Sequence, residues 1–116
     1  MQKKDIVEQL KSICDKYSDI LGTVILFGSY SRDEANDNSD IDLYVEPIDR
    51  SMTTSQFGAN KRYKEFKCTL YDSFSTDFDI LAYGGKRDLA NIKKSPIWTR
   101  IMKDGVVIYD QGTKAI

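Results

Sequence analysis

The 116-residue sequence contains no histidine. The chain therefore lacks the usual general base of Ser-His and Cys-His catalysis, and it also lacks the commonest zinc ligand. Its two cysteines, Cys14 and Cys68, lie far apart and form no C-x-x-C motif, so we expect reduced thiols and no metal or redox centre. Any chemistry must therefore come from carboxylates, hydroxyls, cations and the backbone.

Long apolar runs and a strong net charge are also missing. No stretch reaches the roughly 18 apolar residues of a membrane span, and the charged N-terminus does not resemble a signal peptide, so we expect a cytoplasmic protein without a membrane partner. Lys and Arg total 17 against 18 Asp and Glu, which gives a net charge of −1. Without a global basic field, broad nucleic-acid binding is not expected, although a local basic patch stays open.

The length and composition are those of one globular domain. The hydrophobic fraction is 41% and the charged fraction 30%, and a chain of this length buries roughly 60–70% of its unfolded surface. No repeat, low-complexity tract or Pro/Gly linker divides it. We therefore expect residues 1–116 to form a single domain.

Hydrophobic periodicity predicts helices and strands in mixed order. Helices are predicted over residues 3–17, about 53–70, 88–94 and from Ser95-Pro96 to Gly105, with one helical turn at 31–35. Strands are predicted over residues 23–27, 40–45, 77–83 and 106–109. The fold class is therefore α/β (α+β), a small mixed β-sheet with helices packed mainly on one face.

Two aspartates share one face of the second predicted strand. In Asp40-Ile41-Asp42 the carboxylates lie at i and i+2, about 6.5–7 Å apart along the strand, while Ile41 points the other way into the core. Two such carboxylates repel each other, and a divalent cation with oxygen ligands relieves that repulsion. Asp79 in the third predicted strand adds a third carboxylate if the two strands are neighbours. The three would then form a two-metal phosphoryl-transfer site holding Mg²⁺ or Mn²⁺.

The bend after the first strand complements these acids. Gly28 lets the backbone approach a phosphate closely, and the N–H and hydroxyl of Ser29 can donate to phosphate oxygens. Arg32, one turn later, can pair with the same triphosphate. Ser39 either caps the loop before Asp40 or contacts phosphate. The pattern thus predicts a bend that holds a nucleoside triphosphate, with an incoming hydroxyl attacking its α-phosphorus and pyrophosphate leaving.

The combined motif Gly28-Ser29-x10-Asp40-x-Asp42 resembles the signature of DNA polymerase β-type nucleotidyltransferases. The flanking residues look most like the minimal nucleotidyltransferases (MNT) of prokaryotes. The similarity covers residues 20–46 strongly and 77–110 weakly, including Phe78-Asp79-Ile80-Leu81 and the closing helix and strand. It implies a polymerase β palm-like fold, with Asp40, Asp42 and Asp79 as metal-binding catalytic residues.

Members of that group are often paired with HEPN-domain proteins in toxin–antitoxin modules. The resemblance implies a metal-dependent enzyme that transfers NMP, with AMP from ATP expected, to a tyrosine hydroxyl of a HEPN toxin. One alternative is a non-catalytic antitoxin that masks its partner. Another is adenylylation of a small molecule such as an aminoglycoside, although enzymes of that type typically carry a further substrate-binding domain.

Several residue assignments stay open at this stage. Asp77 competes with Asp79 for the third carboxylate, and Arg32 could instead form a surface salt bridge. Glu46 is only a candidate general base. A solvated helix face is expected for the basic side chains Lys61, Arg62, Lys64 and Lys67, with the steering of a nucleotide or a partner as the alternative. The acceptor, the base of the nucleotide and any homo-oligomer are not specified by the pattern.

Overall fold

The computed structural model describes residues 2–36 and 38–111. Within them the chain runs α1 (Lys3–Asp15), β1 (Leu21–Phe27), β2 (Ile41–Pro47), α2 (Thr54–Ala59), α3 (Lys61–Ser73), β3 (Phe78–Ala82), α4 (Lys86–Ile92), α5 (Pro96–Asp104) and β4 (Val106–Asp110). The predicted α/β class is confirmed. None of the helices in this part of the chain has the length and hydropathy that a membrane span requires.

The four strands form one mixed sheet in the order β3-β2-β1-β4. The central strand β1 is antiparallel to both β2 and β4, whereas β2 and β3 are parallel. The crossover from β2 to β3 contains α2 and α3, as a parallel connection requires. Because β2 and β3 are parallel and in register, their first residues lie side by side at one end of the sheet.

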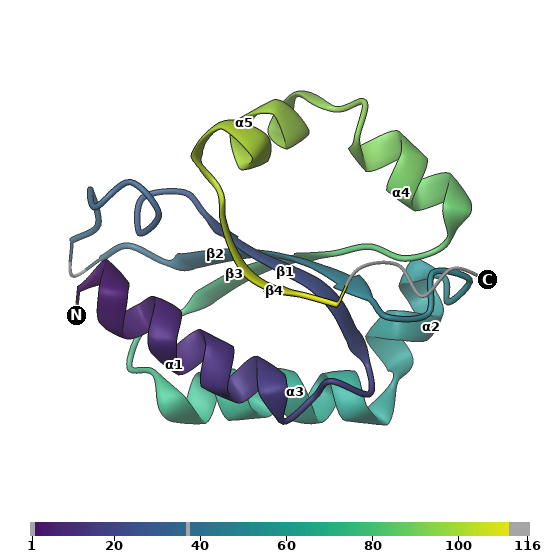
Figure 1. Ribbon diagram of the computed structural model, residues 1–116, viewed down its shortest axis with the longest axis horizontal. Helices are drawn as coiled ribbons and strands as arrows, with labels where there is room; N and C mark the ends of the chain where they lie inside the picture. The colour runs from purple at the N-terminus through teal and green to yellow at the C-terminus, as the bar shows by residue number, and fades with distance from the viewer. Residues whose placement is uncertain (1, 37, 112–116) are drawn as a thin grey trace.

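Helices cover both faces of the sheet (Figure 1). The larger core lies under α1 and α3 and receives Val24 and Leu26 from β1 with Leu43 and Val45 from β2. Alternate residues point to the opposite face, under α4 and α5. There, a second core contains Ile25, Phe27, Tyr44, Ile92 and Ile101. Strand alternation thus divides the apolar residues between two layers.

The helix predicted over residues 53–70 is two helices, so that boundary was wrong. Asn60 has an extended backbone (φ −67°, ψ 131°), and its side chain accepts hydrogen bonds from Arg62 N–H and Tyr63 N–H. Thr53 caps α2 through a reciprocal capping box with Gln56. Both caps satisfy amide groups that would otherwise lack a partner, which explains why the chain stops and restarts at Asn60.

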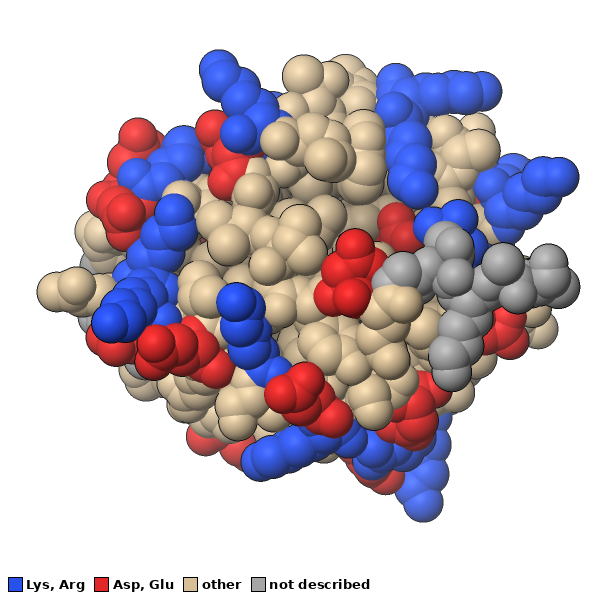
Figure 2. Space-filling model, viewed as in Figure 1, with Lys and Arg blue, Asp and Glu red and all other residues tan. Residues whose placement is uncertain are grey.

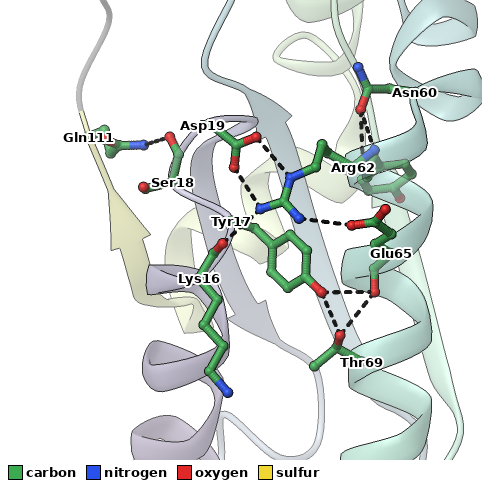
Figure 3. Close-up of polar contacts among 10 residues, drawn as sticks. Lys16, Tyr17, Ser18, Asp19, Asn60, Arg62, Glu65, Thr69 and Gln111 are labelled. Atoms are coloured by element: carbon green, nitrogen blue, oxygen red, sulfur yellow. Dashed lines mark hydrogen bonds and ion pairs between the residues drawn. The ribbon is translucent and has the colours of Figure 1, made fainter.

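Arg62 is exposed over 41% of its side chain, as expected for a solvated helix face, but it also makes contacts that the sequence did not predict. Its guanidinium donates to both carboxylate oxygens of Asp19, at 2.9 and 3.1 Å, and to the carbonyl of Lys16 at 2.9 Å (Figure 3). It also lies 4.6 Å from the centre of the Tyr17 ring. These contacts tie the start of α3 to the loop between α1 and β1. Gln111 ties the end of β4 to the same loop through the carbonyls of Ser18 and Leu21.

Candidate active site

The site begins where β1 ends, at Gly28. The backbone of Gly28 has a φ of +76°, a conformation that favours glycine. The carbonyl of Gly28 accepts hydrogen bonds from the N–H and the hydroxyl of Ser31, at 3.1 and 2.7 Å. The carbonyl of Ser29 accepts from the N–H groups of Arg32 and Glu34. These bonds close a compact bend.

Residues 31–35 form turns and not the predicted helical turn. Asp33 has a φ of +57°, which lies outside the right-handed helical region. Arg32 therefore leaves the chain from a tight turn. Its guanidinium donates to Glu34 at 2.9 Å and reaches Asp104 of α5 at 3.5 Å. The salt bridge considered from the sequence is therefore present, and it joins the bend to α5.

Asp42 packs directly against the bend. In the β1–β2 register Asp42 is opposite Phe27, the residue before Gly28. A Cβ atom built on Gly28 would lie 2.9 Å from Cγ of Asp42 and still closer to its Oδ2. Glycine is therefore required at position 28 for close packing against the carboxylate as well as for its backbone conformation.

Asp79 lies beside Asp42 on the neighbouring strand. The two residues are register partners in the parallel β2–β3 pair, so their side chains share one face of the sheet. Asp40 lies one residue before β2 and is exposed. Partial burial, followed by the charges of Asp79 and Asp40, raises the pKa of Asp42 to about 6, while Arg100 and Arg32 act to lower it. All three predicted carboxylates thus interact at one end of the sheet.

A cavity of about 180 Å³ lies at this end of the sheet, and Asp40 is not one of the residues that line it. Asp42, Asp79 and Gly28 line it from the sheet and the bend, while Arg32 and Arg100 line it from the turn and from α5. Phe27, Ile97 and Asp104 complete the wall. The arrangement combines carboxylates for a cation with guanidinium groups for phosphate oxygens.

Sequence reasoning missed Arg100. Ile97 and Ile101 pack α5 onto the second core, and Arg100 lies at the flank of that apolar stripe. Helical spacing indicates that Arg100 leaves the core at the side of α5, but it does not tell which end of the sheet the residue faces. Only the tertiary arrangement brings its charge to Asp42.

The donor set has the chemistry that a divalent cation needs. Carboxylate oxygens are hard ligands, and a bound cation would offset both the burial and the repulsion from Asp79 and Asp40 that raise the pKa of Asp42. Within residues 2–36 and 38–111, however, no three carboxylate or thiolate groups lie close enough together to hold one ion.

Four further residues considered from the sequence lie outside the cavity wall: Ser29, Ser39, Asp77 and Glu46. The hydroxyl of Ser39 accepts a hydrogen bond from Asn36 N–H at 3.0 Å and so caps the loop. Of the two competing acids, Asp79 lines the cavity, while the carbonyl of Asp77 accepts from Ile41 N–H at 2.9 Å. Glu46 is buried, accepts a hydrogen bond from the Tyr44 hydroxyl at 2.5 Å, and lies four residues along β2 from Asp42.

Solved structures with the same fold are toxin–antitoxin complexes. A chain of a toxin–antitoxin complex with AMP-PNP is 21% identical (TM-score 0.55), over 87% of this chain and 73% of that one. A chain of a mutant MntA–HpeT complex is 18% identical (TM-score 0.57), over 96% and 75%. A third structure is the tri-AMPylated Shewanella oneidensis HEPN toxin in complex with MNT antitoxin, with 17% identity (TM-score 0.55) over 95% and 74%. At these identities the likeness shows the fold.

The sequence itself was compared with curated proteins and with protein families. No curated protein matches it significantly. One family, described as polymerase beta, nucleotidyltransferase, matches residues 8–114, which include the bend, all three aspartates and the closing strand. A match over nearly the whole chain establishes that this protein belongs to the polymerase β nucleotidyltransferase family.

Proposed function

We propose that the protein transfers AMP from ATP to a hydroxyl group of a partner protein, using Asp40, Asp42 and Asp79 as metal-binding catalytic residues. One observation carries the proposal. Asp42 and Asp79 are register partners on adjacent strands, Asp42 packs against the Gly28 bend, and both line a cavity that two arginines also line. This arrangement combines a metal-binding face with an anion-binding wall.

Each side of the cavity has a distinct part in the reaction. The Gly28-Ser29 bend and Arg32 hold the triphosphate, and Arg100 lies across the cavity where charge develops on the phosphate oxygens. Arg32 must first exchange its partners Glu34 and Asp104 for phosphate. Bound Mg²⁺ or Mn²⁺, two ions in this proposal, would neutralise the triphosphate and activate the attacking oxygen. The acceptor oxygen bonds to the α-phosphorus, pyrophosphate leaves, and the hydroxyl proton passes to solvent.

The partner proposal comes from the solved structures. One of them is a toxin–antitoxin complex with AMP-PNP, and another is an AMPylated HEPN toxin in complex with MNT antitoxin. We therefore propose that this chain is a cytoplasmic single-domain antitoxin and that its acceptor is a tyrosine of a HEPN toxin. Ser39, which caps its loop, would contribute indirectly by fixing the approach to Asp40.

The test is the transfer of label from α-labelled ATP, with Mg²⁺, to a purified HEPN-domain protein supplied as the proposed partner. Wild type should label the partner. Asp40→Asn/Asp42→Asn should reduce the rate by at least about a thousandfold, because the metal-dependent charge stabilisation is lost. Lys103→Gln, an exposed change on α5, is the control and should leave the rate unchanged. Equal labelling by the double variant and wild type would remove the proposal.

The same double variant separates catalysis from masking. If AMP transfer neutralises the toxin, the variant should still bind the partner but should not restore growth of cells that express it. If the variant restores growth as well as wild type does, the protein acts by masking. Arg100→Gln should lower the transfer rate about tenfold to a hundredfold without affecting partner binding, because Arg100 acts on the nucleotide.

A further inference from the structure

A second and larger cavity lies away from the aspartates. Its volume is about 880 Å³, within the range of small-molecule sites. Residues after the ends of β2 and β3 line it, including Arg50 and Ser51 on one side and Gly84 to Leu89 on the other. Asp42 and Asp79 lie near the starts of the same strands, and Glu46 lies four positions along β2 from Asp42, a distance of about 13 Å. The two cavities are therefore distinct.

The wall of this second cavity is rich in cations. Arg50, Lys86, Arg87 and Lys93 all line it, and Figure 2 shows Lys and Arg side chains gathered over α4 at the upper right. Among the described residues of the wall, Asp88 is the one acid; it accepts a hydrogen bond from the Thr54 hydroxyl at 2.6 Å and pairs with Arg87 at 3.3 Å. In a chain with a net charge of −1, this concentration of positive charge is local.

A buried carboxylate holds two of these cations in place. Glu46 is 4% exposed, and its oxygens lie 3.7 Å from Nζ of Lys93 and 4.0 Å from a guanidinium nitrogen of Arg50. The Tyr44 hydroxyl also donates a hydrogen bond to Glu46. Arg50, which follows β2, and Lys93, which follows α4, are thus attracted to the same carboxylate, that of Glu46. Four cations still face two carboxylates, Glu46 and Asp88, so the cavity keeps a positive excess.

The geometry points to a binding site in this cavity for a compact anion that carries two or more phosphate groups. Phosphate matches the wall because guanidinium groups bind it bidentately and lysines complete the charge. No aromatic side chain lines the described wall, so nothing there stacks on a nucleotide base. Recognition is therefore expected to depend on the phosphates. This inference goes beyond the transfer reaction and does not depend on it.

The test measures binding of inorganic tripolyphosphate by calorimetry, in EDTA so that no metal assists the aspartate site. Lys86→Gln/Arg87→Gln changes two exposed side chains of the cavity and should weaken binding at least tenfold. Lys11→Gln/Lys64→Gln removes two exposed lysines from the opposite helical layer and should leave the affinity unchanged. Lys93 lies 5.6 Å over the ring of Trp98, the only tryptophan, so binding should also change the tryptophan fluorescence, and Lys93→Gln should abolish that change.

Three results would overturn the inference. The first is the absence of tripolyphosphate binding by wild type at low salt. The second is binding that survives Lys86→Gln/Arg87→Gln but is lost in Arg32→Gln/Arg100→Gln, which would place the anion at the aspartate cavity. The third is tighter binding of poly-glutamate than of tripolyphosphate with the same residue dependence, which would assign the cavity to an acidic protein segment.

Discussion

Gly28 and Asp42 depend on each other at the scale of single residues. The bend needs a residue that accepts a φ of +76°, and the carboxylate needs a neighbour without a side chain. One glycine meets both needs. The sequence motif predicted a glycine that lets phosphate approach the backbone. The structure shows a second role: because Gly28 has no side chain, the Asp42 carboxylate can pack against the backbone of the bend.

Gly28→Ala should therefore damage both stability and activity. The positive φ should cost roughly 1–2 kcal/mol, and the new methyl group should displace the Asp42 carboxylate. Urea unfolding and the AMP-transfer rate measure the two effects. Gly58→Ala is the matched control, because nothing lies within 4 Å of a Cβ atom built on Gly58 in α2. There alanine should be neutral or stabilising by up to about 1 kcal/mol. Similar losses in both variants would contradict the packing argument.

Asp42 should make the stability of the metal-free protein depend on pH. Folding raises its pKa from 3.8 to about 6, so between pH 4 and pH 6 the folded protein binds more protons than the unfolded chain. Stability from this residue is then present below pH 4 and lost as the pH rises through 6. Asp42→Asn should be more stable than wild type at pH 7.5 by about 1 kcal/mol, after allowance for solvent screening.

Urea unfolding in EDTA at several pH values tests this expectation, and the advantage of Asp42→Asn should vanish near pH 4. A carboxyl NMR titration provides the control. Asp79→Asn removes a neighbouring negative charge, so the pKa of Asp42 should move down toward its ordinary value. An Asp42 pKa that does not respond to Asp79→Asn would show that the charge of Asp79 contributes nothing to the shift.

At the scale of helices and strands, the predictions succeeded where a local pattern decides the structure. Alternation in Asp40 to Val45 placed Leu43 and Val45 in the core and Asp42 on the other face. The break at Asn60 was missed, because a single cap residue competes there with an otherwise continuous helical stretch. The position of Arg100 was missed for another reason: it depends on how α5 crosses the sheet, which no local pattern encodes.

The cap at Asn60 gives a prediction for α3. Asn60→Ala removes the acceptor for the N–H groups of Arg62 and Tyr63, which should lower the free energy of unfolding by about 1 kcal/mol. Asn60→Asp replaces the amide oxygen with a carboxylate oxygen, which can accept the same two hydrogen bonds, and should preserve most of the stability. Urea unfolding distinguishes the two variants. If both lose the same amount, Asn60 contributes through something other than its cap.

At the scale of the whole molecule, the sheet brings together residues that are far apart in sequence. The bend at Gly28, the aspartates of β2 and β3, and Arg100 of α5 meet only because β2 pairs with both β1 and β3. None of these contacts exists in the unfolded chain. A ligand that uses all of them therefore binds the folded state alone, and its binding energy adds to the stability of the fold.

ATP with Mg²⁺ should consequently raise the melting temperature. A ligand at a hundred times its Kd stabilises a fold by about 2.7 kcal/mol, which corresponds to roughly 10 °C for a domain of this size. Differential scanning fluorimetry measures the shift. Asp40→Asn/Asp42→Asn should lose the part of the shift that requires Mg²⁺, because the carboxylates that share the ion with the triphosphate are gone. An Mg²⁺-dependent shift of the same size in this variant would mean that the nucleotide binds elsewhere, and the proposed roles of the aspartates would then be wrong.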